Sequence, residues 1–328
     1  MSNKRLTIRI KNIFKKIEKK SFFLSVLHRF FMFSSIKLLG VKNTVKLKFK
    51  SRLGYKLDLS SPKTFNEKIQ WLKMYYFEDF YLQSCDKYLI RDYIKSIIGF
   101  DCCPPVLFVS KKVEDFSIDK IQLFPCILKI SNGSGQNLII YDKKEYTDKT
   151  LRKMIKKMIY EANTHARYGC EPQYLKKDPY IIVEQLLLDK EGRLPNDYKL
   201  FFFNGRLEFI YCSVDRLGGN YRQLYDEDWN RLDFLLLEDS NVDKYERNKN
   251  SNSIPQPESF SEMKDIGATL SKNFPLVRID FYDVDGKLYL GEITLHHGSG
   301  HDMFYPREYD LLYGEKLNLP KQNFTLKI

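Results

Sequence analysis

The chain has 328 residues, of which 43% are hydrophobic and 15% aromatic, which is enough for one or two packed domains and excludes a wholly disordered or collagen-like chain. Six cysteines without a Cys-x-x-Cys pair exclude a disulfide scaffold and a cysteine-built zinc site, so we expect buried free thiols in a reducing cytoplasm. The net charge of +12 is concentrated in residues 1–50, which hold 14 Lys and Arg and one acid. A nucleic-acid enzyme would spread basic residues over its body, so we expect no nucleic-acid partner.

The N-terminal arm, residues 1–50, joins a basic part over 4–20 to an aromatic-rich part over 21–40. The aromatic part is too interrupted by charge for a membrane-spanning helix, and we expect no cleaved signal peptide. The pattern over residues 1–40 favours an interfacial helix whose aromatics enter the acyl boundary while its lysines meet an anionic membrane surface. A helix packed on the body and a basic RNA-binding arm are the alternatives.

The rest of the chain mixes helical and strand patterns. Helical periodicity predicts helices over residues 61–81, 86–98, 147–162 and 262–273. Short apolar runs predict strands over residues 106–109, 124–130, 137–141 and 180–188. Two hairpins are indicated, around Asn204-Gly205 and around Asp285-Gly286, and the polar residues 239–258 indicate a surface loop. The mixture predicts an α+β fold with antiparallel strands in two clusters.

A short glycine-containing loop, residues 131–136, follows Lys129 at the end of an expected strand. Backbone N–H groups of such a loop can lie against phosphates, and the lysine adds a positive charge. The loop is not a P-loop, because the Gly-Lys-Ser/Thr pattern is missing and a strand follows it. An ordinary hairpin turn is the alternative.

Two carboxylates stand on the last expected hairpin, Asp280 with Arg278 on one strand and Glu292 on the other. Mg²⁺ in a nucleotide site takes one or two carboxylates together with phosphate oxygens. A two-residue turn would point the two acids to opposite faces. We therefore predict a three-residue loop, 284–286, which pairs Asp280 with Leu290 and Arg278 with Glu292 and places the three charged side chains on one face. A cross-strand Arg–Glu pair on a surface hairpin is the alternative.

Polar groups elsewhere add to this pattern. The Gly-Ser loop that follows Thr294 could hold a substrate carboxylate or an oxyanion, whereas its histidines (His296, His297 and His301) lack the frame of a common zinc site. Glu184, Asp197 and Lys199 stand in apolar strands, where a charge must be paired or functional.

In this order, the motifs resemble the ATP-grasp superfamily, and within it the teichuronopeptide-biosynthesis (TupA-like) branch, from about residue 60 to about residue 315. The matching segments are Ser61-Pro-Lys-Thr-Phe-Asn-Glu-Lys-Ile-Gln-Trp-Leu-Lys73, Asp86-Lys-Tyr with Arg91-Asp-Tyr, Leu128-Lys-Ile-Ser-Asn-Gly-Ser-Gly135, Ile182-Val-Glu-Gln-Leu186, Asp197-Tyr-Lys-Leu-Phe-Phe-Phe-Asn-Gly205, and Arg278-Ile-Asp-Phe-Tyr with Gly291-Glu-Ile-Thr294.

The resemblance implies an ATP-grasp fold, in which two α+β subdomains with mostly antiparallel sheets clasp ATP between them. The expected divisions are the arm over 1–50, a helical region over 51–110, a small subdomain with the glycine flap over 111–188, and a large subdomain with the metal site over 189–328.

The resemblance also implies the site residues. The nucleotide-binding set comprises Lys87, Arg91, Lys129, Ser131, Gly133, Ser134, Gly135, Glu184, Gln185, Leu186 and Asp197. Lys129 is also expected to act in catalysis, with Arg278 and Lys199. Asp280 and Glu292 are the implied ligands of two Mg²⁺ ions, with Thr294 where most relatives carry Asn. The implied substrate loop comprises His297, Gly298, Ser299 and Gly300.

The implied reaction is ATP-dependent ligation of a carboxylate to an amine through an acyl phosphate. The expected substrates are a uronic-acid-containing cell-surface polysaccharide or its precursor and an amino acid or other amine, handled in the cytoplasm or at the inner face of the cytoplasmic membrane. The alternatives are an ATP-grasp kinase acting on a sugar hydroxyl and a non-catalytic, membrane-associated component of polysaccharide assembly.

Overall fold

The computed structural model describes residues 34, 36–175, 178–214, 221–237 and 253–327. Residues 1–33, on which most of the interfacial-helix prediction rests, lie outside this range, as does most of the loop expected over 239–258.

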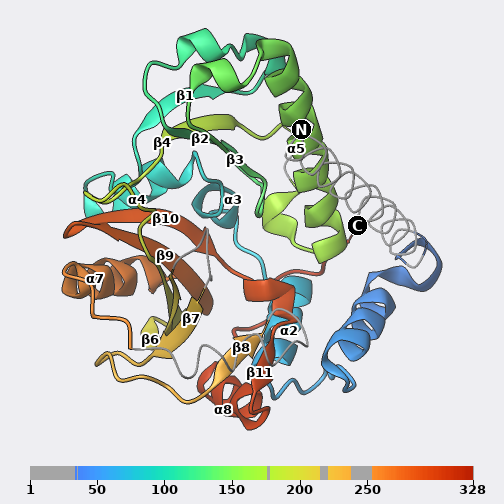
Figure 1. Ribbon diagram of the computed structural model, residues 1–328. Helices are drawn as coiled ribbons and strands as arrows, with labels where there is room; N and C mark the ends of the chain where they lie inside the picture. Colours follow the sequence, from blue (N-terminus) through green and yellow to red (C-terminus); the bar gives the residue numbers. More distant parts are fainter. Residues whose placement is uncertain (1–33, 35, 176–177, 215–220, 238–252, 328) are drawn as a thin grey trace, which may run out of the picture.

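Two antiparallel sheets form the body, the smaller above the larger in Figure 1. The small sheet has the order β1-β4-β2-β3, and its strands are β1 (Val106–Ser110), β2 (Cys126–Ile130), β3 (Asn137–Ile140) and β4 (Ile181–Gln185). The large sheet has the order β10-β9-β5-β6-β7, and its strands are β5 (Asp197–Phe203), β6 (Arg206–Val214), β7 (Tyr221–Tyr225), β9 (Leu276–Val284) and β10 (Lys287–Thr294). The predicted α+β class with two antiparallel clusters is confirmed. The sequence did not predict a third pair, β8 (Leu235–Leu237) with β11 (Met303–Tyr305).

The helices cover these sheets. They are α2 (Phe65–Tyr75), α3 (Tyr81–Ser84), α4 (Ile90–Ile98), α5 (Asp148–Gly169), α7 (Phe260–Ser271) and α8 (Glu308–Lys316), preceded by a helix over residues 36–53. The helix expected over 61–81 begins only at Phe65, because Thr64 and Glu67 form a reciprocal capping box that fixes its first turn. The helix expected to end at residue 162 continues to Gly169 and ends at Cys170, whose backbone is left-handed.

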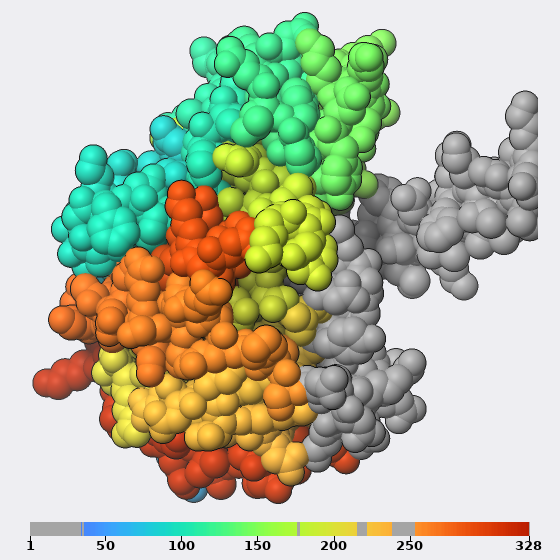
Figure 2. Space-filling model, turned by 60° about the vertical axis from the view of Figure 1, so that its left-hand side comes forward, coloured from blue at the N-terminus to red at the C-terminus, as the bar shows by residue number. Residues whose placement is uncertain are grey.

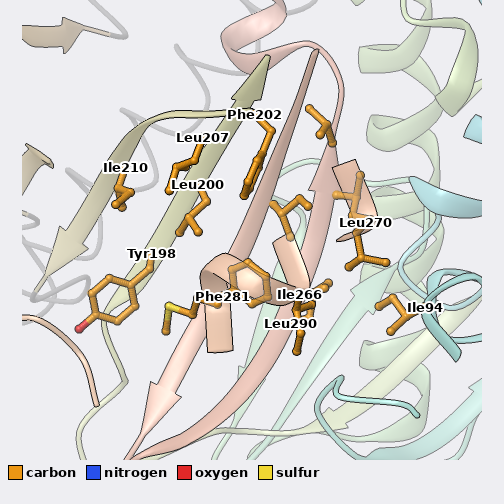
Figure 3. Close-up of a cluster of buried hydrophobic side chains, with 14 of the residues drawn as sticks. Ile94, Tyr198, Leu200, Phe202, Leu207, Ile210, Ile266, Leu270, Phe281 and Leu290 are labelled. Atoms are coloured by element: carbon orange, nitrogen blue, oxygen red, sulfur yellow. The ribbon is translucent and has the colours of Figure 1, made fainter. Parts of the chain in front are cut away.

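Alternation along the large sheet divides its side chains between two cores. Leu200, Phe202 and Phe281 face α7, where they meet Ile266 and Leu270 (Figure 3). The opposite face carries an aromatic cluster that packs against α2 and α8, comprising Phe201, Phe203, Phe209, Tyr211 and Tyr313. Polar residues that stand between the side chains of the first core along a strand therefore lie on the opposite face of the sheet, toward α2.

The β9–β10 hairpin departs from the predicted register. Its turn has two residues, Asp285 and Gly286, both with positive φ, so the expected three-residue loop is wrong. The expected pairings of Asp280 with Leu290 and of Arg278 with Glu292 are also wrong, because Arg278 pairs with Thr294. A bulge at Gly291 inserts one residue into β10 instead, and Glu292 then pairs with Asp280. The predicted shared face is confirmed. The extra residue of the bulge turns Glu292 to the face that Arg278 and Asp280 occupy, which a two-residue turn alone would not do. Only glycine fits there, since a Cβ on Gly291 would lie 2.7 Å from the Tyr282 ring.

The helix over residues 36–53 packs on the body through Val45, Phe49 and Leu53, which meet Met74 of α2 and Leu326 near the C-terminus. The alternative of a packed helix therefore holds for this described part of the arm. No helix in the described ranges is both long and apolar enough to cross a bilayer.

Candidate active site

Two neighbouring cavities lie where the sheets approach one another. The first, the hinge cavity, has a volume of about 230 Å³ and is lined by Pro104, Ile127, Lys129, Asn137, Ile139, Glu184, Gln185, Leu186, Leu187, Leu194, Pro195 and Tyr282. The second, the acidic cavity, has a volume of about 430 Å³ and is lined by Lys48, Lys87, Asn132, Gly133, Ser134, Ala162, His165, Ala166, Tyr168, Gly169, Glu171, Tyr174, Arg278, Glu292, Thr294, His296, Gly298 and Ser299. Figure 2 shows the chain that follows β4 (yellow-green) between the small-sheet part (green) and the large-sheet part (orange).

Arg278 organises the carboxylates of the β9–β10 hairpin. Its Nε and Nη2 donate to Asp280 at 2.6 and 2.7 Å, and Nη2 also donates to Glu292 Oε1 at 2.7 Å. Burial alone would lower the pKa of Arg278, but Asp280 and Glu292 raise it above its ordinary value. For Asp280, burial outweighs Arg278 and Lys199 and raises the pKa. Burial would also raise the pKa of Glu292, but Lys87 and Arg278 hold it well below the ordinary range.

Lys87 links the glycine loop of the small sheet to this acidic pair. Its Nζ donates to Gly133 O at 2.5 Å and lies 3.3 Å from Glu292 Oε2. The loop itself is anchored by Ser131, whose hydroxyl donates to Asp86 at 2.7 Å and accepts from the Tyr180 N–H at 2.9 Å. Gly133 and Ser134 of the loop and Glu292, predicted from separate motifs, therefore line the same cavity, whereas Asp280 is not among its lining residues.

A second group of charges closes the hinge cavity. Lys129 Nζ lies 2.7 Å from Glu184 Oε2, and Arg91 Nη2 lies 3.3 Å from Glu184 Oε1. Glu184 is buried, and these two cations offset the cost of burying its charge. The rest of the lining comes mainly from β2, β3 and the segment after β4, with Pro104 before β1 and Tyr282 of β9.

Comparison with known families identifies the chain. A family model described as TupA-like ATPgrasp matches residues 67–318. The chain belongs to this family.

Solved structures similar to this TupA-like ATP-grasp chain include ligases. It shares 17% sequence identity with the D-alanine–D-alanine ligase from Bacillus anthracis over 72% of this chain and 65% of that chain, with a TM-score of 0.41. It shares 14% identity with the L-amino acid ligase from Bacillus licheniformis over 66% of this chain and 42% of that chain, with a TM-score of 0.36. The chain thus spans less than two thirds of the length of these ligases. A search of curated proteins found no match.

The donor set of the TupA-like chain suits Mg²⁺. Asp280 and Glu292 accept hydrogen bonds from the same Arg278 nitrogen, which keeps the two carboxylates next to one another. Thr294 adds a hydroxyl, which donates to Glu292 Oε1 at 3.0 Å. In the described residues no group of three or more His, Cys, Asp and Glu side chains is arranged to hold a metal. A site with two carboxylates leaves the other positions of a magnesium ion to phosphate oxygens and water.

The acidic and basic residues of the site balance one another. In the described part of the chain, the ion-paired cations of this network are Lys87, Arg91, Lys129, Lys199 and Arg278, and the paired acids are Asp101, Glu184, Asp197, Asp280 and Glu292. Lys199 joins the network through Asp197 and through Asp280, whose Oδ2 lies 3.4 Å away.

The structure places some expected site residues outside the cavities. Ser131 is buried beneath the loop that it anchors. His297 lies behind the cavity wall, where its Nδ1 is 2.7 Å from Arg278 Nη1 and its Nε2 is 3.1 Å from Asp302. Because a guanidinium only donates, Nδ1 must accept and the ring proton lies on Nε2. His296, rather than His297, lines the acidic cavity.

Sequence reasoning missed several cavity residues. Tyr282 follows Asp280 by two positions on β9, so strand alternation could have placed it on the same face. Lys48 and Glu171 come from the helix over 36–53 and from the segment after α5, and no local motif marks either as a site residue.

Proposed function

We propose that this chain is an ATP- and Mg²⁺-dependent ligase that joins a carboxylate to an amine through an acyl phosphate. The observation that supports the proposal is the acidic cavity, in which Gly133 and Ser134 of the small sheet face Arg278 and Glu292 of the large sheet. A polyphosphate bound there would meet the loop backbone on one side and metal-holding carboxylates on the other. The TupA-like ATP-grasp family assignment agrees with this reaction class.

In this proposal the adenine occupies the hinge cavity. Ile127, Ile139 and Leu186 give this cavity apolar surface that suits a flat ring. Glu184 lies beside them, and a ribose hydroxyl could donate to its carboxylate. Lys129 lines the hinge cavity and would exchange part of its pairing with Glu184 for a phosphate oxygen.

Asp280 and Glu292 would hold Mg²⁺, with Thr294 beside them. The metal supplies charge neutralisation and orientation of the phosphate oxygens. Arg278 keeps both carboxylates on one face, and we assign it a positioning role in addition to the predicted contact with developing charge. Lys87 would move its ammonium from Glu292 towards the phosphates while remaining next to the loop.

The reaction balances as two displacements. A substrate carboxylate oxygen attacks the γ-phosphorus of ATP, the bond to the bridging oxygen breaks, and ADP leaves. The nitrogen lone pair of a neutral amine then attacks the acyl carbon. The C–N bond forms, the C–O bond to phosphate breaks, and inorganic phosphate leaves with that electron pair and takes up the proton that the nitrogen loses.

We further propose that the carboxylate belongs to a uronic acid of a cell-surface polysaccharide or its precursor, and that the protein works at the cytoplasmic face of the membrane. Support comes from the TupA-like family assignment and from the helix over 36–53, on which Leu38, Leu39 and Leu47 are 81%, 46% and 55% exposed among lysines. Apolar and basic residues on one exposed helix suit an anionic lipid surface.

The proposal is tested in two steps on the full chain. A thermal-shift assay with Mg²⁺ and ATP should raise the melting temperature, and no shift at millimolar nucleotide would reject a functional nucleotide site. ATP turnover with glucuronic acid or a uronic-acid polymer is then measured with hydroxylamine present. Formation of a hydroxamate supports the acyl phosphate. Phosphorylation of the sugar hydroxyls without a hydroxamate would establish the kinase instead.

A further inference from the structure

His297 connects the charged residues of the site to the wall behind them. Its Nδ1 accepts a hydrogen bond from Arg278 Nη1 at 2.7 Å, and its Nε2 lies 3.1 Å from Asp302 Oδ2, with a geometry short of a full hydrogen bond. All three side chains are buried. The carboxylate beside Nε2 favours the tautomer with its proton there, which leaves the Nδ1 lone pair to accept from a guanidinium that can only donate.

Arg278 has one partner that would not bind the metal. In the described part of the chain its other hydrogen bonds go to Asp280, at 2.6 and 2.7 Å, and to Glu292, at 2.7 Å. These carboxylates would hold Mg²⁺, so a bound ion competes with Arg278 for their oxygens. His297 is outside that competition. Its bond to Nη1 can therefore hold the guanidinium in place while the acids turn to the metal.

The orientation of the His297 ring is fixed by the aromatic cluster of the large sheet. Phe201 meets it edge to face, with ring centroids 4.9 Å apart and an angle of 89° between the planes, and the Tyr211 ring lies 6.0 Å away. Both aromatic residues belong to the core that packs against α2 and α8. The ring cannot turn without disturbing this packing, which keeps Nδ1 directed at Arg278.

The backbone between His297 and Asp302 brings their side chains together. Gly298 has φ of 53°, and a Cβ there would overlap the Asp302 carboxylate, so the approach requires glycine at this position. Asn66, the second residue of α2, donates its side-chain amide to Asp302 O at 2.9 Å. The carboxylate that faces Nε2 is thus anchored through its own backbone.

Two further side chains of α2 support the same turn. Gln70 donates to the carbonyls of Ser299 and Gly300 at 2.8 and 2.9 Å, and buried Lys73 donates to Ser299 Oγ at 2.9 Å. No residue of α2 lines either cavity. The influence of this helix on the site therefore passes through the turn that carries His297.

We propose that His297 is a positioning residue of the metal site. Backed by Asp302, it holds Arg278 in the orientation that keeps the carboxylates of β9 and β10 side by side for Mg²⁺. The inference rests on the proposed ATP- and Mg²⁺-dependent function, and it adds a residue that lines neither cavity. Loss of an outer partner of this kind lowers metal affinity by about 10–100-fold.

The test compares two variants that replace different nitrogens of the His297 ring. The amide of His297→Asn reaches the place of Nδ1 and keeps an acceptor for Arg278, whereas that of His297→Gln reaches the place of Nε2 and faces Asp302. The measurement on the full chain, at a fixed concentration of a non-hydrolysable ATP analogue, is the Mg²⁺ concentration that gives half of the nucleotide-induced melting shift. We expect it to rise at least tenfold in His297→Gln and to stay within threefold of the unaltered chain in His297→Asn. Equal values in the two variants overturn the inference, because a side chain that only fills space would not distinguish them.

A measurement on the unaltered chain keeps the test independent of whether the variants fold. With ¹⁵N-labelled histidine, long-range proton–nitrogen NMR spectra distinguish protonated from unprotonated ring nitrogens, and contacts with the Phe201 and Tyr211 rings identify the His297 signals. We expect an unprotonated Nδ1 and a protonated Nε2. A proton on Nδ1 overturns the inference, because that nitrogen could not then accept from Arg278.

The failure of the inference and that of the proposed function are distinguishable. If the unaltered chain shows a Mg²⁺-dependent shift and both variants share its Mg²⁺ requirement, the inference falls and the proposed function stands. If the unaltered chain shows no nucleotide-induced shift at any Mg²⁺ concentration, the proposed function and the metal role of His297 fall together, whatever the NMR spectra show.

Discussion

Glu292 is the residue on which most of the site converges, because Arg278, Lys87 and Thr294 all contact its carboxylate. Glu292→Gln keeps the shape and one acceptor oxygen but removes the charge that would hold the metal. We expect kcat for ATP turnover to fall at least a hundredfold while the melting temperature changes by a few degrees at most. Glu262→Gln, on the exposed side of α7, is the matched control. Full activity in Glu292→Gln would reject the metal assignment.

Lys73 provides a pH test of the support beneath the substrate turn. Burial lowers its pKa from 10.5 to about 8, although Glu171 opposes the change. Between pH 8 and 10.5 the folded protein has therefore lost a proton that the unfolded chain keeps. The free energy of unfolding should rise with pH through this window, by about 1.4 kcal/mol per pH unit from this group.

Denaturant unfolding of the unaltered chain and of Lys73→Met at pH 8, 9 and 10 isolates this effect. The unaltered chain should gain stability relative to the variant as the pH rises. A difference that stays constant over the three values would show that folding does not lower the pKa of Lys73.

Among the elements, the glycine loop depends on one lysine for its position over the acids. Lys87 bonds the carbonyl of Gly133 and also approaches Glu292. In Lys87→Met we expect KM for Mg²⁺-bound ATP to rise at least tenfold, because both the phosphate contact and the loop position are lost. Lys95→Met, an exposed lysine on α4, should leave KM unchanged. Equal KM values in the two variants would remove Lys87 from the nucleotide site.

The contact between α2 and α8 has no space for an added side-chain atom. A Cβ on Gly314 would lie 2.1 Å from Lys63 O and 2.7 Å from Phe65 N, at the start of α2. Gly314→Ala should therefore destabilise the fold by about 1–3 kcal/mol, the usual cost of overpacking. Thermal unfolding measures this, with Glu315→Ala as the control on the exposed side of α8. An unchanged melting temperature would show that the two helices can separate at little cost.

Most helices and strands could be predicted from the sequence, and so could the shared face of the charged residues on the last hairpin. The backbone geometry that produces this shared face could not. Strand alternation and helical periodicity are local signals, so β5, β6, β9 and α7 could be predicted. The shared face of Asp280 and Glu292 was predicted correctly although the predicted loop length was wrong. The extra residue lies in the bulge at Gly291 and not in the loop. A glycine inside a strand is the sequence signal of such a bulge. Lys48 and Glu171 could not be predicted, since they are about 120 residues apart and only tertiary packing brings them together.

At the scale of the whole molecule, the proposed membrane contact gives a test on lipid vesicles. The full chain should sediment with vesicles that contain phosphatidylglycerol and less with pure phosphatidylcholine, because each lysine near an anionic surface contributes about 1 kcal/mol. Replacing Leu38 and Leu39 by Glu should reduce the bound fraction. The same change at Leu311 and Leu312, an exposed pair on α8, is the matched control. Equal binding to both lipids would reject an electrostatic anchor.

The ion-pair network around the cavities holds five cations and five carboxylates, and this composition affects which charged form of the nucleotide can bind. Free ATP would bring about four negative charges to cavities whose linings hold four cations, Lys48, Lys87, Lys129 and Arg278, against three carboxylates, Glu171, Glu184 and Glu292. When ATP is bound to divalent cations, the same molecule would carry less negative charge and would fit this small positive surplus better. Magnesium would then be needed for nucleotide binding as well as for the chemistry. In a cell extract treated with a chelator, ATP should therefore not bind to this protein.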